Sequence, residues 1–224
     1  MPVGGKDMVD AETVEVSTGD DIQLGVIWLH GLGADGHDFE PIVGQLTLPF
    51  AARFIFPHAA LRPVTINGGM RMRAWYDIVS IDSAGPEDAE GIAASATLVS
   101  ALIDRELERG LKSERIVLAG FSQGSVIAMH CALRESRRLA GLMVLSGYLA
   151  LPDSLQTDRN PANADIDIWM AHGRDDQVID IRLAEKSRDR LLEANYTVAW
   201  RTYPMGHAVC SEQIADISAW LGRC

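Results

Sequence analysis

Short runs of apolar residues, bounded by turn-forming residues, recur along most of the 224-residue chain. Six of these runs are rich in Val and Ile and have the length of buried strands. They span residues 24–30, 54–57, 116–121, 142–146, 166–172 and 196–203. A further segment, residues 13–17, alternates Val with polar residues, which is typical of an exposed edge strand or of one arm of a hairpin.

Segments with helical spacing separate these predicted strands. The clearest is residues 87–109, where apolar side chains repeat every three or four residues along one face. Pro86 and the acids that follow it favour a helix start, and Gly110 favours its end. Further helices are predicted over residues 123–133, 181–193 and 210–221. Near-continuous apolar strands that alternate with helices indicate an α/β fold, with a mostly parallel sheet covered by helices on both faces.

One long segment, residues 58–86, breaks this alternation and shows no sustained periodicity. Loops of this length in compact domains are usually either functional or disordered. Its aromatic residues and methionines argue against disorder, so we expect an ordered loop beside a binding cleft; the alternative is an insertion that only packs on the surface. We predict an open apolar groove, and its expected wall residues are Met70, Met72 and Trp75 from this loop together with Leu32 and Val178.

The chain shows no internal repeat, no low-complexity tract and no linker between segments of different composition, so we expect one domain over residues 1–224. A long insertion between two strands of an α/β domain can form a lid or cap over a binding site. The interval between the fourth and fifth predicted strands, residues 147–165, is short, rich in Pro, Asp and Asn, and lacks helical periodicity. We therefore expect no large cap domain, a preference for soluble substrates and an open site.

Composition and charge exclude several classes of function. Twenty Lys and Arg against 31 Asp and Glu give a formal charge of −11, which opposes binding to nucleic acids and to anionic membrane surfaces. The longest uncharged run, residues 116–133, contains the polar stretch Ser-Gln-Gly-Ser in its middle, so stable membrane insertion is not expected.

The cysteines and the first residues of the chain indicate where the protein works. Cys131, Cys210 and Cys224 are an odd number and lack metal-ligand spacing, so neither a disulfide framework nor a metal site is predicted. Residues 1–21 contain no apolar stretch long enough for a signal peptide. We expect a cytoplasmic protein that needs no metal and no organic cofactor, and the sequence is compatible with a homodimer.

The sequence Gly120-Phe121-Ser122-Gln123-Gly124 is a Gly-x-Ser-x-Gly motif. The pattern alone is weak, because it arises by chance in about one in a dozen chains of this length. Its context strengthens it, since a buried strand precedes it and a predicted helix follows. This is the strand-turn-helix setting of a nucleophile elbow, in which two glycines allow a tight turn and the serine lies at a helix N-terminus.

A serine needs a base to remove its proton and an acid to orient that base. Among six histidines, His207 is the best candidate base, because it follows the last predicted strand and precedes the last helix. The acid is expected between Ser122 and His207, after a strand. Asp175 and Asp176 both qualify, and the spacing does not separate them.

A Gly-rich turn, His30-Gly31-Leu32-Gly33, directly follows the first long strand. Its glycines allow backbone amides to turn toward a substrate oxygen, so we predict an oxyanion hole formed by the N–H groups of Leu32 and Gln123. A glycine-rich loop after a strand can also bind phosphate. The spacing matches neither of the common nucleotide-binding motifs, so nucleotide binding is the weaker hypothesis.

Taken together, these motifs resemble the phospholipase/carboxylesterase family of α/β hydrolases, which includes bacterial carboxylesterases and acyl-protein thioesterases. The matching segments extend from residue 30 to residue 210 and are His30-Gly31-Leu32-Gly33-Ala34-Asp35-Gly36, Pro57-His58-Ala59, Asn67-Gly68-Gly69, Ala74-Trp75-Tyr76-Asp77, Gly120-Phe121-Ser122-Gln123-Gly124 and His172-Gly173-Arg174-Asp175-Asp176.

This resemblance implies an α/β-hydrolase fold and assigns roles to individual residues. It makes Ser122 the nucleophile, His207 the base and Asp176, rather than Asp175, the acid. The chain departs from the family pattern at Ser125, where another glycine is common, and at Gln177, where a proline is common.

Three functional hypotheses follow. The leading one is a serine carboxylesterase that hydrolyses short to medium acyl esters through an acyl-enzyme on Ser122. The second is an acyl-protein thioesterase or lysophospholipase with the same triad. The third is an inactive binding protein with a hydrolase fold, and the presence of all three triad residues argues against it.

Overall fold

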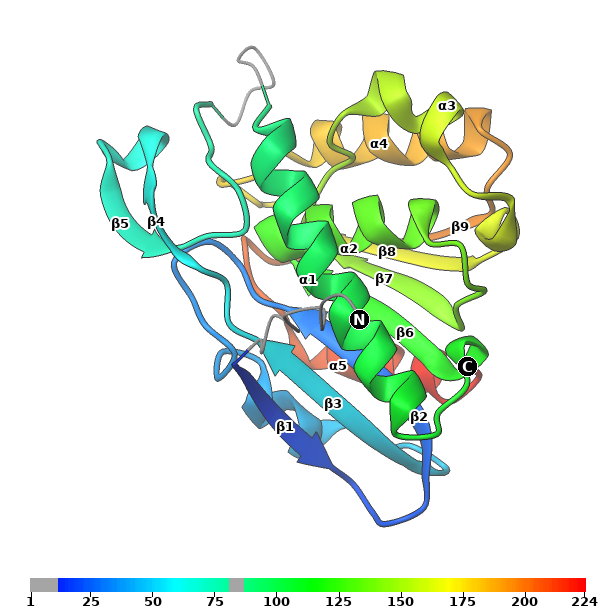
Figure 1. Ribbon diagram of the computed structural model, residues 1–224. Helices are drawn as coiled ribbons and strands as arrows, with labels where there is room; N and C mark the ends of the chain where they lie inside the picture. Colours follow the sequence, from blue (N-terminus) through cyan, green and yellow to red (C-terminus); the bar gives the residue numbers. More distant parts are fainter. Residues whose placement is uncertain (1–11, 81–86) are drawn as a thin grey trace, which may run out of the picture.

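Seven strands form one sheet in the order β1-β3-β2-β6-β7-β8-β9 (Figure 1). The computed structural model describes residues 12–80 and 87–224. Strand β1 pairs with β3 in antiparallel orientation, and all other neighbours in the sheet are parallel. The strands are β1 (Thr13–Ser17), β2 (Ile22–Leu29), β3 (Ala51–Pro57), β6 (Ile116–Phe121), β7 (Gly141–Leu145), β8 (Asp167–Gly173) and β9 (Val198–Tyr203).

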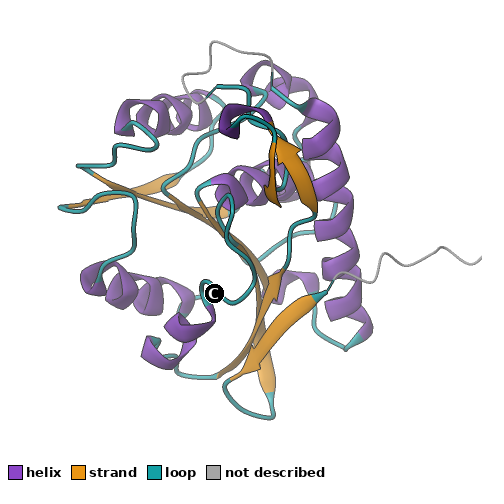
Figure 2. Ribbon diagram, turned by 90° about the vertical axis from the view of Figure 1, so that its left-hand side faces the viewer, coloured by secondary structure: helices purple, strands orange, loops and turns teal. Residues whose placement is uncertain are grey.

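Helices cover both faces of this sheet, and each face has its own apolar core (Figures 1 and 2). On one face pack α1 (Ala89–Glu108), α2 (Gln123–Arg134), α3 (Leu155–Asp158) and α4 (Ile181–Glu193). On the other face pack α5 (Ser211–Leu221) and the 3-10 helix η1 (Glu40–Gln45). Successive residues of the central strands alternate between the two cores, which explains why these strands are apolar throughout.

The predicted α/β fold is confirmed, and the predicted strands and helices all form, with bounds that shift by a few residues. The edge segment pairs as β1 at residues 13–17, as expected. Helix α1 begins two residues after the predicted start, because the Asp88 side chain caps it by accepting from the Gly91 amide at 2.9 Å. The proposed start signal at Pro86 lies outside the described residues, as do residues 1–11.

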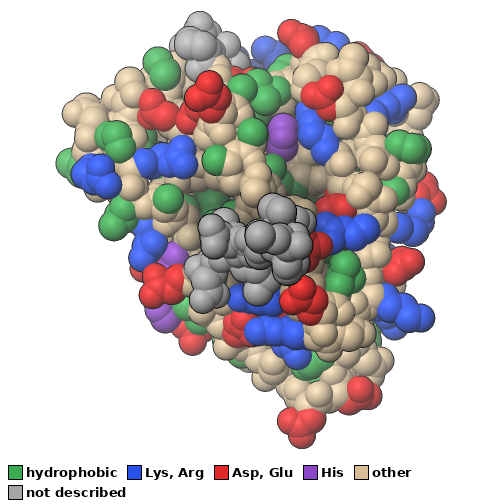
Figure 3. All heavy atoms as spheres, in the orientation of Figure 1, with side chains coloured by type: hydrophobic (Ala, Val, Ile, Leu, Met, Phe, Trp, Pro, Cys, Tyr) green, Lys and Arg blue, Asp and Glu red, His purple; other side chains and the backbone are tan. Residues whose placement is uncertain are grey.

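The long segment 58–86 contains a hairpin that the pattern did not predict. Strands β4 (Leu61–Val64) and β5 (Met70–Arg73) pair in antiparallel orientation and project from the sheet (Figure 1). Hydrophobic side chains and those of Lys or Arg lie on the surface over this part of the molecule (Figure 3). Gly68 and Gly69 adopt φ angles of 65° and 79° at its turn, a conformation that favours glycine. Four-residue strands are too short to show a clear period of two. Residues 81–86 of this segment lie outside the described part of the chain.

The interval between β7 and β8 has little regular structure. It contains α3, which spans four residues, and the two 3-10 helices η4 (Pro152–Ser154) and η5 (Pro161–Asn163). The short helix was not predicted, but the absence of a cap domain from this interval agrees with the expectation. Within the described ranges, no helix has the length and apolar character needed to cross a bilayer.

Candidate active site

Ser122 lies at the sharp turn between β6 and α2, where the sequence predicts a nucleophile elbow. Its backbone has φ 53° and ψ −125°, a conformation that non-glycine residues rarely adopt. The Ser122 amide donates to the Leu145 carbonyl at 2.8 Å, which ties the turn to β7. The residue is 8% exposed, so a small part of it remains accessible.

The two glycines of the motif are required because backbone segments cross at the elbow. A Cβ atom on Gly120 would lie 2.4 Å from the carbonyl of Gly124, and one on Gly124 would lie 2.3 Å from the carbonyl oxygen of Leu29. Real Cβ atoms do not approach other atoms so closely. Side chains at either position would therefore force β6, α2 and the end of β2 apart.

Ser125 and Gly147 fit together next to Ser122. The Ser125 hydroxyl donates to the Ser122 carbonyl oxygen at 2.7 Å. A Cβ atom on Gly147 would lie 1.7 Å from the Ser125 Oγ, so the missing side chain at Gly147 leaves room for this hydroxyl. The serine that departs from the family pattern is thus accommodated by a glycine in the loop after β7.

Asp176, the acid favoured by the resemblance, is in direct contact with His207. Its Oδ2 lies 2.7 Å from the His207 Nδ1. Its Oδ1 accepts from the amides of Val178 and Ile179, both at 2.9 Å, and its side chain is fully buried. Asp175, which spacing alone left as an equal candidate, is exposed.

The loops that carry the predicted acid and base are hydrogen-bonded to each other. The Asp175 amide donates to the Met205 carbonyl at 3.1 Å, and the Arg174 amide donates to the Tyr203 carbonyl at 2.8 Å. A Cβ atom on Gly173 would lie 2.3 Å from the carbonyl oxygens of Met205 and Gly206, so glycine is needed there. This packing fixes the position of His207 relative to Asp176.

His207 also lies against the elbow. Its ring centroid is 4.7 Å from that of Phe121, the residue before Ser122, and its side chain is 16% exposed. Within the described ranges, no hydrogen bond joins the Ser122 hydroxyl to His207. Such bonds are often long in free enzymes and shorten when substrate binds.

The two amides predicted for the oxyanion hole are both free of intramolecular acceptors in the part of the chain that the structure describes. Gln123 is the first residue of α2, so its N–H has no helical acceptor. The Leu32 loop is close by, because a Cβ atom on Gly31 would lie 3.4 Å from the Ser122 Cβ. Two unpaired N–H groups are therefore available beside the serine.

The Gln123 side chain has a structural role that sequence reasoning missed. Its Oε1 accepts from the Trp75 amide at 2.9 Å, and its Nε2 donates to the Tyr76 carbonyl at 2.7 Å. The Trp75 indole N–H donates to the His30 carbonyl at 2.8 Å. These bonds hold the segment after the β4–β5 hairpin against the elbow and against the loop after β2. The pairing of Gln123 with a Trp-Tyr segment carries no local signal in the sequence.

Trp75 was expected to line the groove, and this expectation is wrong. Trp75 is 1% exposed, and its indole is in hydrogen-bond and ring contact with His30. It supports the site from behind. Among the other predicted wall residues, Met70 and Val178 are 65% and 47% exposed, while Leu32 and Met72 are partly buried. The Met72 sulfur lies beside the loop after β2, 3.7 Å from where a Gly33 Cβ would be.

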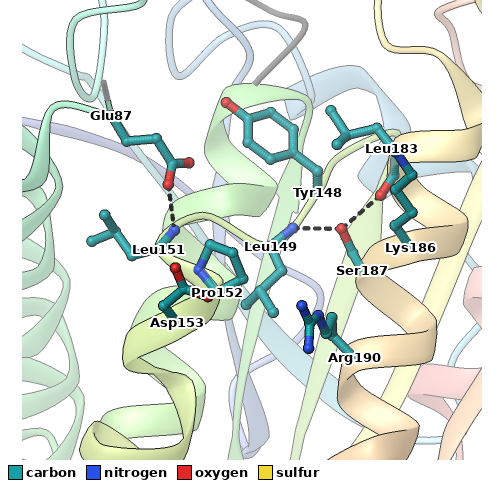
Figure 4. A pocket seen from close by; sticks show the side chains of 10 residues that line it. All are labelled: Glu87, Tyr148, Leu149, Leu151, Pro152, Asp153, Leu183, Lys186, Ser187 and Arg190. Atoms are coloured by element: carbon teal, nitrogen blue, oxygen red, sulfur yellow. Dashed lines mark hydrogen bonds between the residues drawn. The ribbon is translucent and has the colours of Figure 1, made fainter. Parts of the chain in front are cut away.

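A cavity of about 420 Å³ opens between α4, the loop after β7 and the residue before the α1 cap (Figure 4). Tyr148 lies at its inner side, and its hydroxyl is 3.0 Å from that of Tyr76. Leucines form much of its wall, with charged side chains also contributing. The lining residues are Glu87, Tyr148, Leu149, Leu151, Pro152, Asp153, Leu183, Lys186, Ser187 and Arg190.

His30 is buried and helps to hold a neighbouring loop. The His30 Nε2 accepts from the Ala59 amide at 3.0 Å, and burial lowers the pKa of His30 to about 4, so the ring is neutral. Burial likewise lowers the pKa of His130 to about 4. The described ranges contain no group of three or more His, Cys, Asp or Glu side chains that could hold a metal ion.

The fit between Ser125 and Gly147 can be tested by substitution. We predict that Gly147→Ala destabilises the protein by about 1–3 kcal/mol, because its methyl group overlaps the Ser125 hydroxyl. Adding Ser125→Gly removes the clash, so the double variant should regain part of this loss through a coupling of about 1 kcal/mol or more. Urea denaturation measures these changes.

Gly44→Ala is the matched control, since nothing lies within 4 Å of a Cβ at that position. It should change stability by less than about 0.5 kcal/mol. Strictly additive effects of Gly147→Ala and Ser125→Gly would refute the proposed fit.

Known proteins match almost the entire chain. The sequence profile of the phospholipase/carboxylesterase family matches residues 11–224. The acyl-protein thioesterase 1 of Neurospora crassa is 38% identical over 207 residues, which cover 88% of this chain and 84% of that protein. The acyl-protein thioesterase 1 of Cryptococcus neoformans is 34% identical over 214 residues, with 88% and 90% covered.

Solved structures show the same similarity in three dimensions. Zea mays acyl-protein thioesterase 2 superposes with a TM-score of 0.85 at 27% identity and covers 95% of this chain and 98% of its own. Arabidopsis thaliana SOBER1 also gives a TM-score of 0.85, at 29% identity, with 89% and 98% covered. These matches agree with the elbow and the His-Asp pair, and the chain belongs to the phospholipase/carboxylesterase family of α/β hydrolases.

Proposed function

We propose that Ser122, His207 and Asp176 form the catalytic triad of this serine hydrolase and that its preferred substrates are acyl thioesters, such as S-acylated cysteine in a protein. The observation that carries the triad is the 2.7 Å contact between the buried Asp176 carboxylate and the His207 Nδ1, beside the Ser122 elbow. The thioester preference rests on similarity to the acyl-protein thioesterases.

In the first half of the reaction, the Ser122 Oγ attacks the acyl carbonyl carbon while the His207 Nε2 takes the hydroxyl proton. Asp176 holds the Nδ1–H of His207, which keeps Nε2 free as the base and stabilises the imidazolium that forms. The amides of Leu32 and Gln123 donate to the oxyanion. When the tetrahedral intermediate collapses, the carbon–sulfur bond breaks and the thiol leaves with the proton from His207.

In the second half, water hydrolyses the acyl-enzyme. His207 removes a proton from the water as its oxygen attacks the acyl carbon, and it returns that proton to the Ser122 Oγ when the serine ester bond breaks. The products are a carboxylic acid and free enzyme. Every proton is carried by His207, so this cycle uses residues of the chain alone.

The site is suited to an acyl group that is attached to a large molecule. The interval between β7 and β8 supplies no cap domain, and two apolar side chains that the sequence predicted for the groove wall, Met70 and Val178, are exposed. An acyl chain gains about 0.8 kcal/mol for each CH₂ that such apolar surface buries. A thiol or alcohol leaving group on a protein or a lipid can remain outside.

The sequence placed a carboxylesterase acting on short to medium esters first, with thioesterase and lysophospholipase activity as alternatives. The relatives favour the thioesterase, and the same triad chemistry applies to all three substrates. Small oxygen esters therefore remain expected secondary substrates. An inactive binding protein is disfavoured because the three triad residues are all present and Asp176 contacts His207.

Ser122→Ala should abolish hydrolysis while leaving the fold intact. The serine hydroxyl makes no structural hydrogen bond among the described residues, and loss of a triad nucleophile lowers kcat by roughly 10⁶-fold in a well-studied serine hydrolase. Turnover of a chromogenic ester and thermal denaturation are to be measured on the same preparation. A purified variant that keeps more than a few per cent of the activity would reject Ser122 as the nucleophile.

Asp176→Asn should lower kcat far more than Asp175→Asn. Only the carboxylate bonded to the imidazole fixes its tautomer, and its replacement by an amide costs about 10⁴-fold in the chymotrypsin-type template. Asp175 is exposed, so its neutralisation should change the rate by less than about twofold. Both variants replace a carboxylate by an amide, at neighbouring positions, so each is the control for the other. Comparing their kcat values in steady-state kinetics identifies which aspartate is the acid. Equal losses, or the opposite ranking, would contradict the assignment.

The thioester preference is tested by comparing kcat/KM for a matched pair of substrates. An S-acylated cysteine peptide and its O-acylated serine counterpart share the acyl chain and the flanking residues. We expect the thioester to react with the higher kcat/KM, and we expect Ser122→Ala to be inactive on both. A higher kcat/KM for the oxygen ester would instead identify a carboxylesterase that uses the same triad.

A further inference from the structure

His172 is a fully buried histidine that touches the predicted acid of the triad. It lies near the end of β8, four residues before Asp176, and its side chain is 0% exposed. The His172 Nε2 lies 2.8 Å from the Ile179 carbonyl oxygen and 3.4 Å from the Asp176 Oδ2. One ring nitrogen therefore faces two oxygen atoms of the acid loop.

The geometry fixes the state of this ring. A carbonyl oxygen can only accept, so the His172 Nε2 must carry a hydrogen. Burial lowers the pKa of His172, against the opposing effects of the Ile179 carbonyl and Asp176, so the ring is neutral at physiological pH. Its Nδ1 is then bare, and this atom has no hydrogen-bond partner within the described ranges.

The charged groups around His172 come from three elements. Asp176 and Asp180 lie on the acid loop, and His207 comes from the loop after β9. Trp200 of β9 stacks on the His172 ring with a centroid distance of 6.4 Å. The Arg188 guanidinium of α4 lies over the Trp200 ring, 5.3 Å from its centroid.

The bonds of His172 close a cycle with Asp176. The Ile179 amide donates to the Asp176 Oδ1 at 2.9 Å, and the carbonyl of the same residue accepts from His172 at 2.8 Å. The His172 ring thereby holds the Ile179 residue whose amide holds the carboxylate. The same ring nitrogen also faces the Asp176 Oδ2, the oxygen that contacts His207.

We propose that His172 is a positioning residue for the catalytic reaction, which sets the orientation of the Asp176 carboxylate toward His207 as a neutral hydrogen-bond donor. This inference rests on the proposed triad. A neutral donor suits this place because it fixes the carboxylate without cancelling its charge, and that charge must stabilise the His207 imidazolium. A cation at the same place would compete with His207 for Asp176.

Two substitutions at His172 distinguish its role as a hydrogen-bond donor from its role in filling the core. The amide nitrogen of Gln reaches about as far as the imidazole Nε2, so His172→Gln can restore the donor. His172→Leu fills part of the volume without a donor. We expect His172→Leu to lower kcat about 10- to 100-fold, in line with the effect of a displacement of about 1 Å in a catalytic group. KM should stay within about twofold, and His172→Gln should recover most of kcat.

His130→Leu is the matched control. It makes the same replacement at another histidine whose pKa is lowered by burial, but His130 lies on α2 away from the acid loop. It should leave kcat within about twofold. If His172→Leu and His172→Gln lower thermal stability equally and kcat equally, or if neither changes kcat, the donor has no positioning role and the proposal fails.

A double-mutant cycle with Asp176→Asn gives a second readout. If His172 acts through Asp176, then His172→Leu should have much less effect on kcat in the Asp176→Asn background than in the parent protein. Equal fold-losses in both backgrounds would overturn the proposal. Asp176→Asn alone tests the triad. If this variant keeps the activity of the parent protein, the proposed function fails. If Asp176→Asn loses most of the activity but His172→Leu loses none, only the role of His172 is refuted.

If His172→Leu does not fold, His172→Asn replaces it in the comparison with His172→Gln. The Asn amide is shorter and does not reach the Nε2 position, so it should lose activity where Gln keeps it. Equal kcat values for the Asn and Gln variants would contradict the proposed donor.

Discussion

The close approach of backbones at Ser122 is the constraint on which the site depends. Strand β6 ends, the chain turns with a φ of 53°, and α2 starts so near the end of β2 that neither Gly120 nor Gly124 has space for a Cβ. Because the turn is tight, the serine lies at the helix N-terminus beside the unpaired Gln123 amide. A wider turn would separate Ser122 from both the loop after β2 and His207.

The parallel sheet brings the rest of the chemistry to the same place. The loops after β2, β6, β8 and β9 all leave the carboxyl ends of neighbouring strands, so Leu32, Ser122, Asp176 and His207 converge although they are far apart in sequence. Hydrogen bonds between the loops after β8 and β9 then fix the position of His207 relative to Asp176. The Asp176 carboxylate accepts from two amides and faces two imidazoles, which makes it the most connected group of the site.

The sequence predicted the fold and singled out the candidate residues of the site because both depend on local signals. Apolar strands, helical spacing and the Gly-x-Ser-x-Gly turn are contiguous patterns, and His207 was located by its place after the last strand. Asp175 and Asp176 could not be separated by spacing, because one residue decides which carboxylate turns inward. Their difference is set by the amides of Val178 and Ile179, which only the folded loop brings to Asp176.

Features that depend on distant residues were not predictable in the same way. Trp75 was expected on a groove wall because it is large and apolar, but hydrogen bonds to Gln123 and His30 draw it inside. The Ser125–Gly147 pair joins α2 to the loop after β7. The cavity beside Tyr148 is lined by three separate segments of the chain. Such contacts follow from packing, for which one sequence carries no periodic signal.

In the proposed triad, the pair of Asp176 and His207 activates Ser122 for attack on an acyl carbon. Reaction with a fluorophosphonate probe, followed by peptide mapping, tests this activation, since the probe labels only an activated serine nucleophile. We expect one phosphonate group on the peptide that contains Ser122, with labelling slowed strongly in Asp176→Asn. Labelling of a different residue, or equally fast labelling of Ser122 in Asp176→Asn, would contradict it.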